Sequence, residues 1–159
     1  MSSVKRILAA LCLSEHSIDV FQQAVELAQR YDADLYVVNV VDIKDVEDVT
    51  VIESMGYDLH SDDFRKGAKE ERRERLAEVV KGAPIPKEKL HTLIKVGHPV
   101  EQLLKTIDEE HIDLLVIGAK GRSNLPYFMV GSVAEKLFRH SPVTVVSHRD
   151  KRKHGRKTA

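Results

Sequence analysis

The sequence predicts an α/β protein built on one parallel sheet with helices on both faces. Five largely apolar runs alternate along the chain with helical patterns. Apolar strands of this kind are typical of parallel sheets, because helices bury both of their faces. The length of 159 residues fits one domain and is too short for an eight-stranded barrel. We therefore expect a single α/β domain over residues 1–149.

The amino end reads as a strand–helix–strand unit. Residues 4–13 form an apolar run, and residues 35–41 form a second one rich in β-branched side chains. Residues 18–32 between them follow a helical period, with Ser17 as the expected N-cap. The apolar stripe of this helix contains Phe21, Ala24, Val25, Ala28 and Tyr31. A right-handed crossover would make the two strands parallel.

The middle of the chain is more polar. The acidic residues 42–62 are expected to form a long surface loop with at most a helical turn. Residues 63–81 predict a highly charged helix in which Glu71 and Arg75 are spaced for an ion pair. Its core stripe would contain Phe64, Ala68, Leu76, Val79 and Val80.

Three further strands follow, over residues 90–96, 112–118 and 143–148. Pro99 suits the first turn of the helix after the first of these strands. That helix would bury Val100, Leu103, Leu104 and Ile107. A loop over 119–130 then leads to a short helix at 132–140, which precedes the last strand.

The charge distribution and the cysteine content limit the classes of function that the sequence fits. Residues 150–159 carry five Lys or Arg and one Asp, which leaves 20 basic and 24 acidic residues in the body. An acidic body with a basic, disordered tail does not fit a nucleic-acid-binding domain. Cys12, the one cysteine, fits a reducing cytosol and is expected to be a small buried hydrophobe rather than a redox group. Because no signal peptide or membrane span is apparent, we expect a cytoplasmic protein that makes no membrane contact.

A glycine pattern follows the fourth strand. Gly118 and Gly121 precede Gly131-Ser132, with Arg122 nearby, in the spacing Gly-x2-Gly-x9-Gly-Ser. Glycines let backbone N–H groups approach an anion, and a helix N-terminus adds positive potential, so this loop is a candidate phosphate site. Ser132 and Glu135 also form a capping-box pattern that needs no ligand. The residues alone leave both interpretations open.

This spacing resembles the signature of the ATP-binding branch of the universal stress protein family. Other segments match in order, over about residues 4–148: RILAALCLSEHS, VVNVVD, VGHPVEQLL, IDLLVIGAKGRS and GSVAEKLFRHSPVTVVS. The resemblance implies a five-stranded parallel sheet of order 3-2-1-4-5, similar to the adenine-nucleotide α-hydrolases. Strands one and four would then flank the ligand site.

The resemblance also implies ATP, accompanied by Mg²⁺ or Mn²⁺, as the ligand. Gly118, Gly121, Gly131, Ser132 and Val133 would line the triphosphate path, with Arg122 and Ile117 beside it. Ala10, Leu11, Val40, Val96 and Gly97 would surround the adenine and ribose. Family members usually have Asp where this chain has Cys12, and a thiol is a poor substitute for that hydrogen-bond acceptor.

The resemblance favours an ATP-binding stress-response protein that regulates partners and hydrolyses ATP slowly at most. It further implies a homodimer, in which the apolar edge strand from Val143 to His148 pairs with its own copy. One alternative is a dimeric stress protein that binds no nucleotide. A less favoured one is an adenylate-forming enzyme, whose Ser-Gly-Gly-x-Asp-Ser or His-x-Gly-His motifs the segment CLSEHS does not match. The eight histidines show no metal-ligand spacing, and no catalytic residue is predicted.

Overall fold

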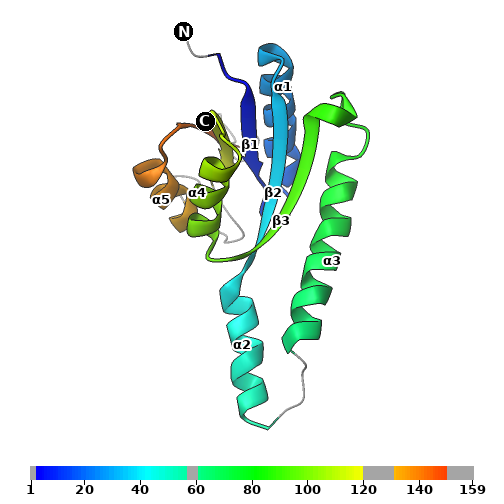
Figure 1. Cartoon of the computed structure of the whole chain (residues 1–159), viewed down its shortest axis with the longest axis vertical. Coiled ribbons are helices and arrows are strands. Elements are labelled where there is room, and N and C mark those ends of the chain that lie inside the picture. The colour runs from blue at the N-terminus through cyan, green and yellow to red at the C-terminus, as the bar shows by residue number, and fades with distance from the viewer. Residues whose placement is uncertain (1–2, 57–60, 120–130, 150–159) are drawn as a thin grey trace, which may run out of the picture.

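Figure 1 shows the fold of the chain in a computed structural model, which describes residues 3–56, 61–119 and 131–149. Five strands form one sheet in the order β3-β2-β1-β4-β5, and every neighbouring pair is parallel. The strands are β1 (Arg6–Ala10), β2 (Asp34–Asp42), β3 (Leu90–Gly97), β4 (Leu114–Gly118) and β5 (Thr144–His148). The predicted fold class and strand order are confirmed.

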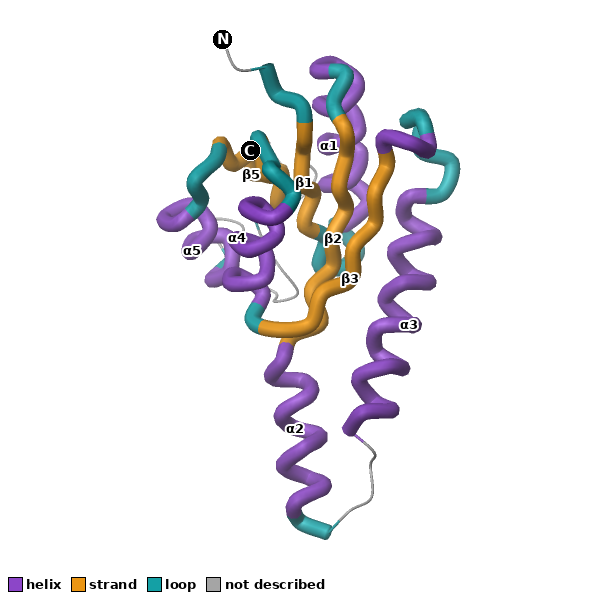
Figure 2. The backbone as a smooth tube through the Cα atoms, viewed as in Figure 1, coloured by secondary structure: helices purple, strands orange, loops and turns teal. Residues whose placement is uncertain are grey.

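Helices cover both faces of this sheet (Figures 1 and 2). α1 (Ser17–Tyr31) and α3 (Ser61–Val80) pack on one face, while α4 (Pro99–Glu109) and α5 (Ser132–His140) pack on the other. α2 (Ile43–Ser54) continues from the end of β2 and, with the first half of α3, extends beyond the sheet. A short 3₁₀ helix (Lys87–Lys89) leads into β3.

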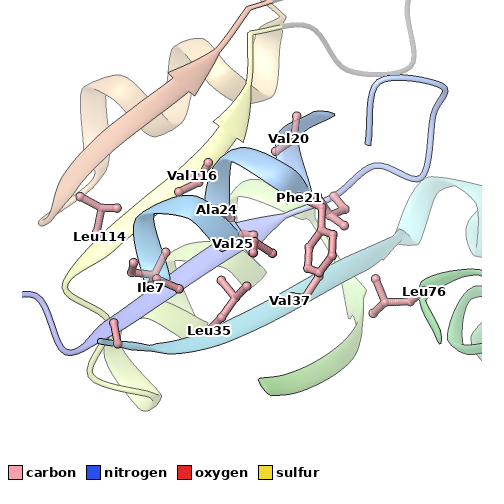
Figure 3. Close-up of a cluster of buried hydrophobic side chains, with 14 of the residues drawn as sticks. Ile7, Val20, Phe21, Ala24, Val25, Leu35, Val37, Leu76, Leu114 and Val116 are labelled. Carbon is pink, nitrogen blue, oxygen red and sulfur yellow. The ribbon is translucent and has the colours of Figure 1, made fainter. Parts of the chain in front are cut away.

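The core has two halves, one on each face of the sheet. On the α1 face, Ile7, Val37 and Val116 from three strands pack against Phe21 and neighbouring residues of α1 (Figure 3). On the α4 and α5 face, the buried residues are Leu8, Tyr36, Val38, Leu103, Ile107, Ile112, Leu115, Ile117, Ala134 and Leu137. The predicted inward positions of α4 agree with this face, since Leu103 and Ile107 are buried and Val100 and Leu104 pack against the cluster.

Leu115 provides a test of this second half of the core. It lies in β4 and is completely buried. We expect Leu115→Ala to lower the free energy of unfolding by about 2–5 kcal/mol, because the change removes apolar contacts and leaves a cavity. Chemical denaturation measures this loss. Ile18→Ala, at a side chain that is 55% exposed, is the control and should cost less than about 0.5 kcal/mol. Equal losses in the two variants would contradict the packing described here.

The prediction of a loop after the second strand is wrong for residues 43–54, which form α2. The side chain of Asp42 accepts a hydrogen bond from the Lys44 N–H at 3.0 Å and so caps the first turn. The helix ends at Met55, and Gly56 follows with φ of 97°. This acidic segment is therefore helical because its amino end is capped and because α3 packs beside it.

Three local predictions on the α1 and α3 face also differ from the structure. His16, not Ser17, is the N-cap of α1, and it makes no side-chain capping bond. Tyr31 is 49% exposed because α1 ends there and the chain reverses at Asp32, where φ is 51°. Phe64 is 39% exposed because it lies in the part of α3 that extends past the sheet. The Glu71–Arg75 ion pair is present at 3.7 Å.

Candidate functional site

The carboxyl ends of β1 and β4 form the point at which the sheet changes direction. After β1 the chain passes into α1 on one face, and after β4 it reaches α5 on the opposite face. Connections that depart to opposite faces leave a crevice between them, and open α/β sheets bind ligands in this crevice. A cleft of about 210 Å³ opens there, bordered by β1, β2, α1, α3, α4 and α5.

The walls of the cleft combine apolar side chains with two groups of polar residues, which come from different elements and are called its two polar ends. Ala10 is the last residue of β1, Leu11 follows it, Val40 lies on β2, and Ile117 belongs to β4. The full set of described residues that line the cleft is Ala10, Leu11, Cys12, Ser14, His16, Ser17, Val20, Val38, Asn39, Val40, Asp42, Arg72, Pro99, Leu103, Ile117, Gly118, Gly131, Ser132, Val133, Ala134 and Leu137. An apolar slot with a few convergent polar groups is the usual form of a small-molecule site.

One polar end lies between β4 and α5. The Gly131 N–H donates to the Ala119 carbonyl at 2.9 Å, and the Ala119 N–H donates to the His148 carbonyl at 3.0 Å. These bonds fix the start of α5 against the ends of β4 and β5. The first helical bond of α5 runs from the Glu135 N–H to the Gly131 carbonyl at 2.9 Å, so the amides before Glu135 begin the helix without intrahelical acceptors.

Gly131 itself is the N-cap of α5, and no side chain of the described residues caps the helix. The capping box considered for Ser132 and Glu135 is therefore not formed. Glu135 instead pairs with Arg139, at 2.8 Å. The hydroxyl of Ser132 lies in the cleft wall beside the positive end of the helix, which is an arrangement suited to an anion.

The other polar end lies between the β1–α1 connection, β2 and α3. Asn39 is 1% exposed, and its side-chain amide donates to the Leu11 carbonyl at 2.6 Å. Arg72 of α3 donates to Asn39 Oδ1 at 3.2 Å, and Arg75 donates to the Leu13 carbonyl at 2.5 Å. These bonds tie α3 to the residues that follow β1. They also place a guanidinium at the cleft.

The cleft brings together nine of the residues proposed from the sequence, namely Ala10, Leu11, Cys12, Val40, Ile117, Gly118, Gly131, Ser132 and Val133. Val96 and Gly97 do not line it. They pair with Val41 and Asp42 at the end of β3, one strand further out. Gly121 and Arg122 lie outside the described residues.

Several polar residues of the cleft were not predicted from the sequence. Asn39 gave a signal, because it interrupts the apolar run LYVVNVV. Ser14 and His16 follow the first strand closely and could have been found from that position. Arg72 gave no signal in the sequence, because only the packing of α3 on the sheet shows which of the many charged residues of this helix lines the cleft.

Within residues 3–56, 61–119 and 131–149, no group of three or more His, Cys, Asp or Glu side chains is placed to hold a metal ion. Over the same residues, no helix has the length and apolar character that crossing a membrane requires. Asp42 is the one carboxylate among the described residues of the cleft, and it is occupied as the cap of α2.

The fold and the cleft define an α/β protein with a doubly wound parallel sheet and a cleft where the strand order reverses. The family is shown by the sequence profile of the universal stress protein family, which matches residues 3–148. The chain belongs to this family. A universal stress protein of Methanocaldococcus jannaschii is 31% identical over 144 residues, which cover 89% of this chain and 81% of that protein.

Solved structures agree with this assignment. The universal stress protein UspA from Lactobacillus plantarum is 28% identical, with a TM-score of 0.65, and the match covers 94% of this chain and all of that one. A universal stress protein solved in complex with cAMP is 21% identical, with a TM-score of 0.58 over 93% of this chain and 98% of that one. At this identity the second match shows the shared fold.

Proposed function

We propose that this chain is a cytoplasmic ATP-binding stress-response protein whose bound nucleotide regulates its interactions with other proteins. The observation that carries the proposal is the cleft at the carboxyl ends of β1 and β4, where an apolar slot meets the uncapped start of α5. Membership of the universal stress protein family and the relative that was solved with cAMP support a nucleotide as the ligand.

In the proposed complex, the adenine and ribose lie along the apolar residues Ala10, Leu11 and Val40. The phosphates extend toward Gly131 and Ser132, where the N-terminus of α5 stabilises negative charge. Gly121 and Arg122, in the loop outside the described residues, would complete this phosphate path. Val96 and Gly97 would reach the nucleotide only from the rim, because β3 lies beyond the described cleft wall.

We further propose that Mg²⁺ or Mn²⁺ accompanies ATP and is held by phosphate oxygens and water. The donor set fits this arrangement, since the described residues at the glycine end of the cleft offer the Ser132 hydroxyl and no carboxylate. The same residues include no side chain that could act as a general base. The proposal therefore assigns ATP a regulatory role, with slow hydrolysis at most.

The proposed assembly is a homodimer through β5, the edge strand of the sheet. Val145 is partly buried against the α4 and α5 face, and Val146 against the α1 face. An exposed edge with β-branched residues and no charge between Val143 and His148 is prone to pair with another strand. Pairing with the same edge of a second copy would satisfy its free backbone groups.

Cys12 gives a test of the nucleotide's position. Its side chain lines the cleft, and its sulfur lies 3.2 Å from the Ser14 hydroxyl. We expect Cys12→Asp to tighten ATP binding roughly tenfold, because a carboxylate would supply the acceptor that relatives usually have at this position. Calorimetric titration measures the change. Cys12→Ala is the matched control and should bind ATP about as the wild type does. An aspartate variant that binds no better than the alanine variant would contradict the proposed position.

A further inference from the structure

The amino end of α1 borders the same cleft as Gly131 at the start of α5. It lies at the polar end formed by the β1–α1 connection, β2 and α3. Ser14, His16 and Ser17 all line the cleft there. The His16 N–H donates to the Ser14 hydroxyl at 3.3 Å, and the Ser17 N–H donates to the Ser14 carbonyl at 3.1 Å. The N-cap of this 15-residue helix, His16, makes no side-chain capping bond. The positive end of α1 therefore lies at the cleft without a cap from that side chain.

Ser17 supplies an independent indication of a ligand. The residue is 3% exposed, and its buried hydroxyl has no hydrogen-bond partner among the described residues. An unsatisfied buried hydroxyl is unfavourable, so its presence in a residue that lines a cleft needs an explanation. Ser14, one turn earlier, is already engaged by the Cys12 thiol and the His16 N–H. Ser17 thus has an unused donor at the wall of the cleft.

Besides His16, the charged side chains that line the described cleft are Arg72 and Asp42, and the Asp42 carboxylate already accepts the Lys44 N–H at the start of α2. Arg72 brings its guanidinium to the cleft and is oriented by the buried Asn39. Glu15, the nearest acid on the connection to α1, is 74% exposed and pairs with His16 at 3.2 Å. Asp19, in the first turn of α1, is not among the residues that line the cleft. Cys12 lines the cleft with a thiol rather than a carboxylate.

We propose that the α1 end of the cleft is a second anion subsite, which binds a phosphate group through Ser17, Arg72 and the first turn of α1. It is separate from the phosphate path at α5. The phosphate would be either a second phosphate on the ribose of the bound nucleotide or free inorganic phosphate. Binding of a ribose phosphate rests on the proposed function, because it requires a nucleotide in the cleft. Binding of free inorganic phosphate requires no nucleotide.

Two isomeric probes separate the two ends of the cleft. ADP carries both phosphates at the 5′ end, whereas adenosine 3′,5′-bisphosphate carries one at each end of the ribose. We expect Ser17→Ala and Arg72→Gln each to weaken the bisphosphate about tenfold and to leave ADP within about twofold, because each change removes a donor to a charged phosphate. Arg72→Lys should recover only part of the loss, since it keeps the charge but loses the planar fork.

Ser147→Ala is the matched control. Ser147 has the second buried hydroxyl without a partner among the described residues, and it lies on β5 outside the cleft lining. In the absence of ligand, Ser17→Ala and Ser147→Ala should each melt at or above the wild-type temperature, because each change removes an unsatisfied hydroxyl. Only Ser17→Ala should change the binding of the bisphosphate. A loss of that binding without a loss of thermal stability cannot come from unfolding.

Titration with inorganic phosphate identifies the source of the anion and does not depend on nucleotide binding. If the subsite takes free phosphate, phosphate binds the wild type, and Ser17→Ala abolishes this binding while Gly131→Val does not. If it takes a ribose phosphate, only the bisphosphate responds to the variants. The subsite is refuted if Ser17→Ala and Arg72→Gln change neither phosphate nor bisphosphate binding, or weaken ADP and the bisphosphate equally. A failure of every nucleotide to bind while phosphate still binds would refute the proposed function alone.

Discussion

Gly131→Val is expected to lower the affinity for ATP by at least about tenfold. Gly131 is the N-cap of α5 and lies in the cleft wall, where any side chain would occupy the space proposed for the phosphates. Keeping a charged phosphate from even one backbone donor costs about 1.5–3 kcal/mol. The backbone tolerates the change, because Gly131 has φ of −62° and ψ of 152°, which valine also adopts.

Calorimetric titration of the folded variant with ATP measures this effect, and thermal melting verifies the fold. Gly67→Val is the matched control. Gly67 lies on α3, and a Cβ there would meet nothing within 4 Å. The control should bind ATP as the wild type does. If a folded Gly131→Val variant also binds ATP with unchanged affinity, the phosphates must lie elsewhere and the proposed orientation of the nucleotide is wrong.

Val145→Pro is expected to convert the proposed dimer into a monomer while the sheet of each chain stays intact. The His148 carbonyl accepts a bond from the Ala119 N–H, so His148 faces β4. Backbone groups of successive strand residues face opposite neighbours, so Val146 and Thr144 also face β4, and Val145 presents its N–H to the open edge. Proline at Val145 therefore removes a donor needed only for pairing with a second copy.

Sedimentation velocity gives the oligomeric state of each variant. Val145→Ala separates the backbone from the side chain, because it keeps the N–H and removes two methyl groups. We expect this control to remain dimeric with weaker association. A wild-type protein that is monomeric at micromolar concentration, or a folded Val145→Pro variant that remains dimeric, would rule out an interface through β5.

The sequence was informative about the sheet and less so about the segments beyond it. Apolar strands and the stripe of α1 could be predicted because burial on both faces of a sheet leaves few alternatives. α2 was missed because its stability depends on the Asp42 cap and on packing against α3, neither of which has a periodic signature. The strand order came from resemblance to a family, since periodicity alone does not say which strands are neighbours.

The residues of the candidate site could likewise be predicted only in part. Residues at strand ends, such as Ala10, Leu11 and Gly118, could be predicted because a parallel sheet brings the carboxyl ends of its strands together. Arg72 could not be predicted, because it reaches the cleft from a helix more than 30 residues away in sequence from Asn39. Ser17 was expected to cap α1, and only the structure shows that His16 takes that position and that the serine hydroxyl has no partner among the described residues.

We propose that this protein is a dimer that binds one adenine nucleotide in each chain, and native mass spectrometry during titration with ATP measures both properties together. We expect the dimer to saturate at two ATP molecules, and Gly131→Val to reduce this occupancy at equal ATP concentration. A spectrum that contains only unliganded protein, even at millimolar ATP, would rule out the proposed nucleotide site.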